Sequence, residues 1–204
     1  MKKNPLLEVM ASVILDVQKK RELRYIWGNS DWGHIGDFGT SDIGLSGELF
    51  ISTLCNLSLI ESDICGKKTK KNKVSGDGTI KKRSCEIKTS RISSSKKQQF
   101  THELGLTPWD VDFMVFLDIS PNMVFITIFP NFSKAFYKKS ASDSSFKCDP
   151  VFSTASFSQR KLKGNFLISL RIGSLERSKF TFKAHKDSMD FHAFKKFVDS
   201  IIKS

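Results

Sequence analysis

Closely spaced cysteine pairs are missing from this sequence, because none of its 4 cysteines forms a C-x-x-C motif. Structural zinc sites are typically built from such pairs, so we do not expect one. A chain of 204 residues is also too large to need disulfides for its stability. Cys55 and Cys85 lie inside apolar patterns, where a reduced cysteine behaves as a small hydrophobic residue. We therefore predict reduced thiols and a cytoplasmic protein.

The sequence also has no apolar run of about 18 residues, the length that a membrane-spanning helix needs. Segment 5–15 has the apolar content of a signal peptide, but Glu8 interrupts it and Asp16 ends it. No small-residue cleavage site follows. These features predict a soluble protein without a membrane partner.

Two further missing patterns concern catalytic sites. The glycine-rich segment 27–44 does not match the phosphate-binding motif G-x-x-x-x-G-K-[ST], so we expect no nucleotide cofactor. A loop of this composition is either functional or a spacer. The histidines have no metal-ligand spacing, and no H-N-H-like pattern follows the one that lies near Asp37. We predict structural or surface roles for His34, His102, His185 and His192.

Positive charge is what the chain has in excess: 33 Lys and Arg face 21 Asp and Glu, which gives a net charge of +12. A field of this size attracts polyanions and accelerates their encounter with the protein. The charge alone does not distinguish DNA, RNA and an anionic membrane surface, and a merely basic protein would have it too. The apolar residues, 39% of the chain, suffice for a core and argue against disorder of the whole chain.

Hydrophobic periodicity predicts helices and strands within a single domain, residues 1–204. Expected helices cover 5–21, 44–57, 96–104 and a closing segment with Phe191, Phe194, Val198 and Ile201 on one face. Expected strands cover 79–89, 111–119, 123–129, 166–172 and 179–182, with a tight turn at 120–122. Ser41 or Asp42 would cap the second helix, whose buried side would consist of Leu45, Leu49, Ile51 and Leu54. This order predicts an α/β fold with a mixed central β-sheet flanked by helices.

The clearest chemical pattern is Asp77-Gly78 followed by Cys85-Glu86-Ile87-Lys88. Side chains alternate along a strand, so Glu86 and Lys88 would share one face while Cys85 and Ile87 point to the other. Asp77 stands at the turn that enters this strand. A hairpin bend could return its carboxylate to the same cleft.

Two carboxylates and an ammonium in one cleft suit phosphodiester hydrolysis. Asp77 and Glu86 are hard oxygen ligands for Mg²⁺, and the main-chain carbonyl of Ile87 is a further candidate ligand. A bound Mg²⁺ polarises the phosphate and lowers the pKa of a bound water. Lys88 would orient or deprotonate that water, or stabilise the negative charge of the transition state.

With these residues the chain resembles the PD-(D/E)xK nuclease superfamily, and within it the type II restriction endonucleases. The resemblance extends over residues 45–130. It implies a restriction-endonuclease-like core, Mg²⁺ with Mn²⁺ as a substitute, Asp77 and Glu86 as metal ligands, and Lys88 as the catalytic lysine. The proline that usually precedes the aspartate is replaced by Gly76.

Other residues have supporting roles in this hypothesis, each with a simpler alternative. Glu48 would be an auxiliary metal or water ligand, or a helix glutamate that reaches solvent. Gln98 and Gln99 would contact a phosphate, or be solvated polar groups. A basic segment, either a DNA-backbone contact or a solvated loop, consists of Lys67, Lys68, Lys70, Lys71 and Lys73.

Three other aspartates carry less weight. Asp63 is farther from Glu86 in the sequence than Asp77 is, and no turn brings it back. Asp110 and Asp112 would share a strand face, which is either a second acidic pair or, as we expect, a solvent-facing edge.

The predicted function is Mg²⁺-dependent cleavage of double-stranded DNA at a short specific sequence, as by a type II site-specific deoxyribonuclease. The catalytic core would cover residues 40–130, and residues 131–204, with Arg160, Lys161 and Lys163, would contribute recognition. Such enzymes usually act as symmetric homodimers, although a monomer that nicks each strand in turn also fits. The alternatives are a structure-specific nuclease, such as a junction resolvase or repair nicking enzyme, and a non-enzymatic basic nucleic-acid-binding protein.

Overall fold

The computed structural model describes residues 9–10, 12–16, 26–64, 76–92, 98–105, 111–130, 149–154, 156–159 and 166–202. The helices are η1 (Gly33–Asp37), α2 (Thr40–Leu57), α5 (Pro150–Thr154), α6 (Ile172–Leu175) and α7 (Phe191–Ile201). The strands are β1 (Ser62–Ile64), β2 (Gly78–Ile80), β3 (Arg83–Arg91), β4 (Gln99–Gly105), β5 (Phe113–Ile119), β6 (Met123–Pro130), β7 (Ser156–Gln159), β8 (Phe166–Arg171) and β9 (Thr181–His185). No helix within these ranges is long and apolar enough to cross a membrane.

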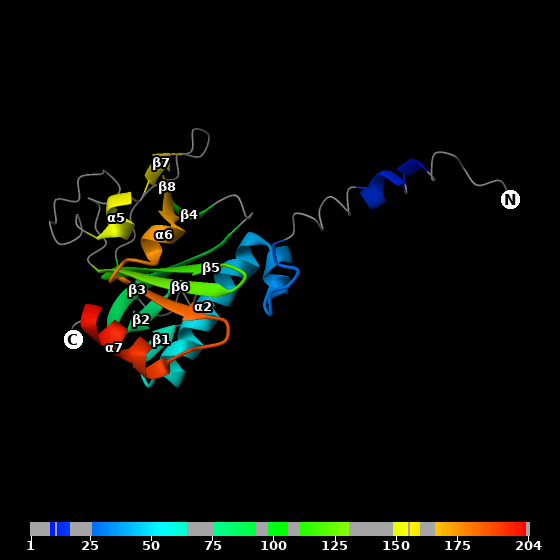
Figure 1. Ribbon diagram of the computed structural model, residues 1–204. Helices are drawn as coiled ribbons and strands as arrows, with labels where there is room; N and C mark the ends of the chain where they lie inside the picture. The colour runs from blue at the N-terminus through cyan, green and yellow to red at the C-terminus, as the bar shows by residue number, and fades with distance from the viewer. Residues whose placement is uncertain are drawn as a thin grey trace.

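Two β-sheets organise the described residues. The larger has the strand order β1-β2-β3-β5-β6-β9, and the smaller has the order β4-β8-β7. Within the larger sheet β3 and β5 run parallel, and the other neighbouring strands are antiparallel. Figure 1 shows α2 and α7 on one side of the larger sheet and the smaller sheet, with α5 and α6, on the other. The predicted α/β fold with a mixed central sheet flanked by helices is therefore confirmed.

Strands β5 and β6 form the middle of the larger sheet. Every residue of β5 is buried, and six of the eight residues of β6 are buried. A strand covered on both faces has a nearly continuous apolar sequence, which explains why this hairpin is readable from the sequence. Its turn is closed by the Ser120 amide, which donates to the Met123 carbonyl at 2.9 Å. The predicted hairpin around residues 120–122 is confirmed.

Alternate side chains of β3 point to the two layers that cover the larger sheet. Thr89 faces α2, because a Cβ atom added to Gly47 would lie 1.7 Å from Thr89 Oγ1. Lys88 points to the opposite face, where its parallel neighbour in register is Phe116 and the Phe116 ring contacts His102 of β4. The odd-numbered side chains of β3 thus meet the helices, and the even-numbered ones meet the smaller sheet.

Helix α2 differs from the prediction at its start and on its outer side. It begins after Gly39, and neither Ser41 nor Asp42 is the N-cap residue. Ile51 and Leu54 are buried as expected, but Leu45 and Leu49 are 41% and 53% exposed. The buried stripe runs instead through Ile43, Gly47, Ile51, Leu54 and Cys55, because the glycine lets the helix approach β3 closely.

Two predicted elements are wrong. The described part of the expected helix 96–104 is not helical, because Gln99–Gly105 is strand β4. Its buried residues Phe100, His102 and Leu104 recur at the strand period of two and face the core. The expected strand 79–89 is a hairpin, in which Lys81 and Lys82 have positive φ angles of 51° and 63°. Positive φ at both central residues is the geometry of a type I′ turn, which usually carries Asn or Gly.

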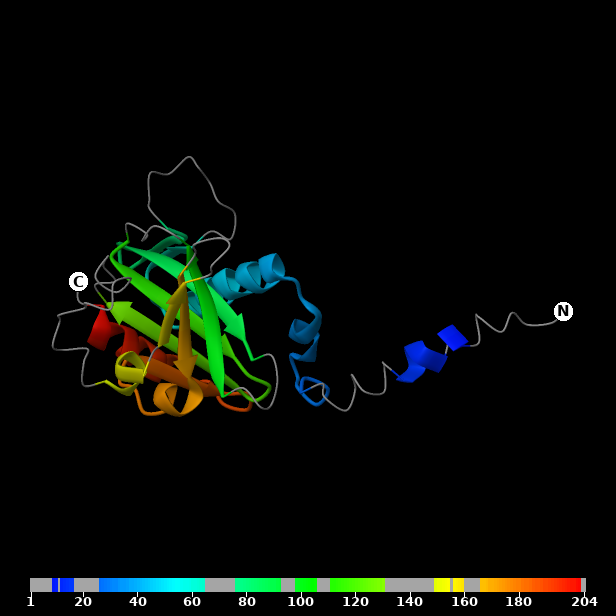
Figure 2. The ribbon, with the colours of Figure 1, turned by 90° about the horizontal axis from the view of Figure 1, so that it is seen from above.

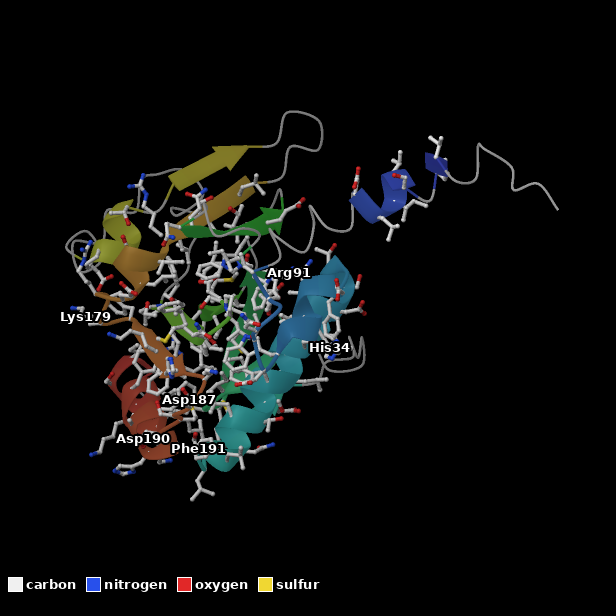
Figure 3. All side chains as sticks on the ribbon, turned by 45° about the vertical axis from the view of Figure 1, so that its right-hand side comes forward. His34, Arg91, Lys179, Asp187, Asp190 and Phe191 are labelled. Carbon is white, nitrogen blue, oxygen red and sulfur yellow. The ribbon has the colours of Figure 1, made fainter. Side chains whose placement is uncertain are left out.

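The glycine-rich segment before α2 packs as a structural element. Trp32 Nε1 donates to the Ser120 carbonyl at 2.9 Å, and Ser30 Oγ donates to the Pro121 carbonyl at 2.8 Å. The Arg91 guanidinium donates to the Ile35 carbonyl. Figure 3 shows Arg91 and His34 on the side of the molecule where α2 lies. This part of segment 27–44 therefore packs against the rest of the fold, and whether it also has a functional role stays a prediction.

The remaining predicted elements have mixed outcomes. The expected strands at 166–172 and 179–182 correspond to β8 and β9, and the expected closing helix is α7. Of the expected helix 5–21, residues 9–10 and 12–16 are described and helical. Cys55 and Cys85 are buried free thiols, as predicted.

Replacing Gly47 by Ala should destabilise the fold by roughly 1–3 kcal/mol, because a methyl group there overlaps Thr89. Gly44 is the matched control in the same helix, since a Cβ atom there has no neighbour within 4 Å. Gly44→Ala should be neutral or stabilise by up to about 1 kcal/mol through helix propensity. Urea denaturation of both variants measures the difference. Equal free energies of unfolding would mean that α2 does not approach β3 as closely as described.

Candidate active site

The β2–β3 hairpin brings Asp77 to the edge of β3. The Asp77 amide donates to the Cys85 carbonyl at 2.9 Å, and the Ile87 amide donates to Asp77 Oδ2 at 2.8 Å. These two bonds flank residue 86, so the Asp77 carboxylate lies against the backbone of Glu86 and Ile87. Ten residues separate Asp77 from Ile87 in the sequence. The predicted hairpin bend therefore returns Asp77 to the E-x-K strand.

The edge that Asp77 occupies also has main-chain oxygen. The N–H and C=O groups of one residue in an extended strand point to the same side. Because the Ile87 amide points to Asp77, the Ile87 carbonyl points to this edge too. Strand β2 pairs with β3 only at residues 83–85, so it does not cover this position. Oxygen Oδ1 of Asp77 has no hydrogen-bond partner within the described part of the chain.

Glu86 and Lys88 form an ion pair on the face that meets the smaller sheet. Lys88 Nζ donates to Glu86 Oε1 at 2.5 Å. The Glu86 side chain is 6% exposed and that of Lys88 is 26% exposed. A buried carboxylate is costly unless it is paired, so Lys88 stabilises Glu86 in this position. Lys88 is thus the more exposed member of the pair.

The pKa of Cys85, the residue before Glu86, is shifted by burial and by the nearby carboxylates. Burial, followed by the negative charge of Asp77, raises the pKa of the Cys85 thiol, and Glu86 acts in the same direction. Burial also raises the pKa of Cys55 to about 11. Both thiols therefore stay protonated, and neither is a nucleophile at neutral pH.

Gly76 explains why this chain lacks the proline expected before the aspartate. Its φ angle is +85°, whereas proline is restricted to about −65°. A Cβ atom at this position would lie 2.3 Å from the Cys85 carbonyl oxygen and 2.7 Å from Val111 Cγ1. Only glycine allows the chain to pass this close to β3, and this path delivers Asp77 to the edge.

The supporting residues lie in different places. Glu48 lies on α2, which packs against the opposite face of β3 from Glu86 and Lys88, so its auxiliary role stays a prediction. Gln98 and Gln99 are exposed at the start of β4, and the Gln98 carbonyl accepts from the Ile172 amide at 3.0 Å. Outside the described residues lie Lys67, Lys68, Lys70, Lys71, Lys73, Arg160, Lys161 and Lys163.

Two of the competing aspartates are described. Asp63 lies exposed on β1 and pairs with Thr79, so β2 separates it from β3. Asp112 Oδ2 accepts from the Ser84 amide at 2.8 Å and from Ser84 Oγ at 2.9 Å. Burial opposes ionisation of Asp112, but these bonds and Arg83 outweigh it and lower the pKa. Asp112 thus joins the starts of β3 and β5, and Asp110 lies outside the described residues.

Side chains alone do not make a complete cation site in this part of the protein. Among the described residues, no group of three or more His, Cys, Asp or Glu side chains could hold a metal ion. Asp77 and Glu86 supply two carboxylates, so main-chain oxygen would have to complete the set. The Ile87 carbonyl points to the same edge as Asp77, and all three donors are the hard oxygen ligands that Mg²⁺ prefers.

A buried histidine–aspartate pair beneath the site was not predicted. His102 Nε2 and Asp118 Oδ1 are 2.8 Å apart, and the two side chains are 1% and 0% exposed. Asp118 is the register neighbour of Ser90, on the same face of β3 as Lys88. Burial raises the pKa of Asp118, while His102 acts in the opposite direction. The sequence does contain a signal for this pair, because Asp118 is the one ionisable residue of the otherwise apolar strand β5.

Comparisons of the chain with known protein families, with curated proteins and with solved structures found no match.

Replacing His102 by Phe should destabilise the protein by roughly 3–5 kcal/mol, because it leaves Asp118 buried without its partner. Replacing both residues, His102→Phe with Asp118→Leu, should cost less than His102→Phe alone, since no charge is then buried. Chemical denaturation of the single and double variants tests this. A double variant less stable than either single variant would show that the pair is not the dominant interaction there.

Proposed function

We propose that this chain is a Mg²⁺-dependent endonuclease that hydrolyses phosphodiester bonds of double-stranded DNA, as type II restriction endonucleases do. One observation carries the proposal: the Asp77 carboxylate accepts a hydrogen bond from the amide of Ile87, the residue that lies between Glu86 and Lys88 in the sequence. The net charge of +12 supports a polyanionic substrate. A restriction-endonuclease-like core is part of the same proposal.

Each residue of the trio has a distinct role in the proposed reaction. Asp77 and Glu86, with the Ile87 carbonyl, would hold the cation. When bound, Mg²⁺ supplies Lewis acidity and a water of lowered pKa. Lys88 is a cation and a hydrogen-bond donor in its pair with Glu86, so it would stabilise the charge that develops on the phosphate. Its partial exposure leaves it accessible to that phosphate.

The non-enzymatic alternative is favoured by a different observation. Glu86 is already neutralised by Lys88, and no three-ligand side-chain group was found in the described ranges. A basic nucleic-acid-binding protein needs neither a metal nor an accessible lysine. Such a protein would bind DNA with a steep salt dependence, and Lys88→Ala would weaken DNA binding by no more than the loss of one charge does.

Incubation of plasmid and phage DNA with the full chain tests the proposal. Discrete, reproducible fragments are expected with Mg²⁺ and none without it. Branched DNA incubated in parallel separates a junction-specific nuclease from one that cuts linear duplexes. Intact DNA with Mg²⁺ and with Mn²⁺ would count against any nuclease.

Matched variants identify the residues responsible. Lys88→Ala should slow cleavage by about 10²–10³-fold, the typical loss when one group that stabilises the transition state is removed. Lys82→Ala removes the same charge from the exposed hairpin turn and should leave cleavage nearly unchanged. Asp77→Asn should abolish cleavage, and Asp63→Asn is its control on the exposed strand β1. Equal effects of Lys88→Ala and Lys82→Ala would refute the assignment.

A further inference from the structure

Helix α2 has an unusual outer surface for so basic a chain. Its 18 residues contain no Lys or Arg and only two acidic residues, Asp42 and Glu48. Leu45 and Leu49 are 41% and 53% exposed, and one helical turn separates them. A helix with apolar residues on its outer as well as its inner side is typical of a covered helix. Without basic residues this surface does not suit nucleic acid.

A second uncovered apolar helix lies near the N-terminus. Its residues 9–10 and 12–16 are helical, and Val9, Met10, Val13, Ile14 and Leu15 are between 49% and 61% exposed. Figures 1 and 2 show this helix apart from the sheets and from α2 in both views. Apolar side chains exposed together on one helix are typical of a surface that packs against another protein.

We propose that the N-terminal helix of one copy packs on the outer face of α2, around Leu45 and Leu49, in a second copy. The two apolar surfaces belong to the same chain, so a second copy supplies the complement of each. A two-fold axis would make the contact twice, because each copy gives one helix and receives one. Small residues beside the leucines, Ser46 and Ser52, allow a helix to approach.

Within one copy the N-terminal helix and the outer face of α2 leave each other uncovered, which favours exchange between copies. In both views the helix lies apart from the α2 of its own chain. Segment 17–25 and the packed segment 26–39 separate the two helices in the sequence. This inference does not depend on nuclease activity, since oligomeric state is measured without DNA. It would give the proposed enzyme a dimer of the kind that cuts both strands of a duplex.

Light scattering coupled to size exclusion, on the full chain at tens of micromolar, measures the mass. We expect twice the chain mass of 23.1 kDa for the wild type. Ile14→Glu on the N-terminal helix and Leu49→Glu on α2 should each give monomers. Leu59→Glu is the control, because Leu59 is 83% exposed but lies after α2. Since all three side chains are exposed, circular dichroism should show a native fold in every variant.

Mixing the two monomeric variants decides between exchange and other contacts. The Leu49→Glu chain keeps an intact N-terminal helix, and the Ile14→Glu chain keeps an intact α2 face. Their equimolar mixture should regain part of the dimer, because one of the two contacts can form between them. A monomeric wild type, or a dimer that Ile14→Glu does not weaken, or a mixture that stays monomeric, would each overturn the proposal.

Discussion

The hydrogen bond from the Ile87 amide to the Asp77 carboxylate is the constraint on which the candidate site depends. It requires a chain path close enough to β3 that Gly76 has a positive φ angle and no room for a Cβ atom. It also requires β2 to stop pairing before it reaches residue 87, so that a side chain can take the place of a backbone carbonyl. Loss of either condition would leave the carboxylate without its anchor.

The two faces of β3 separate structural and chemical roles. The face toward α2 is apolar and closely packed, with Cys85 and Ile87 buried and Thr89 against Gly47. The opposite face, toward the smaller sheet, carries the Glu86–Lys88 pair, and beside it the His102–Asp118 pair joins β4 to β5. A buried polar group is stable only with its particular partner, so the His102–Asp118 pair, which connects the smaller sheet to the larger one, specifies how the two sheets align.

The net charge and the outer side of α2 differ in character. The chain as a whole is strongly basic, and this suits a polyanion approaching the side where Lys88 is partly exposed. The outer side of α2 lacks basic residues and exposes leucines, which suits an apolar partner. The proposed nucleic acid and the proposed second copy of the chain would therefore not compete, because they would use surfaces of opposite character.

Local sequence patterns determined the features that hydrophobic periodicity encodes directly. These are the apolar hairpin of β5 and β6, the amphipathic helix α7, and the position of Glu86 and Lys88 on one face of a strand. Other features were decided by contacts between residues distant in the sequence. Lys81 and Lys82 are not residues that usually form a tight β-turn, yet the pairing of Ile80 with Arg83 requires the turn between β2 and β3. Residues 99–105 became a strand because β8 pairs with them, and Leu45 and Leu49 are exposed because Gly47 turns α2 toward β3. The tertiary structure also decided where the Asp77 carboxylate lies, since its anchor is an amide ten residues away that only the folded hairpin presents.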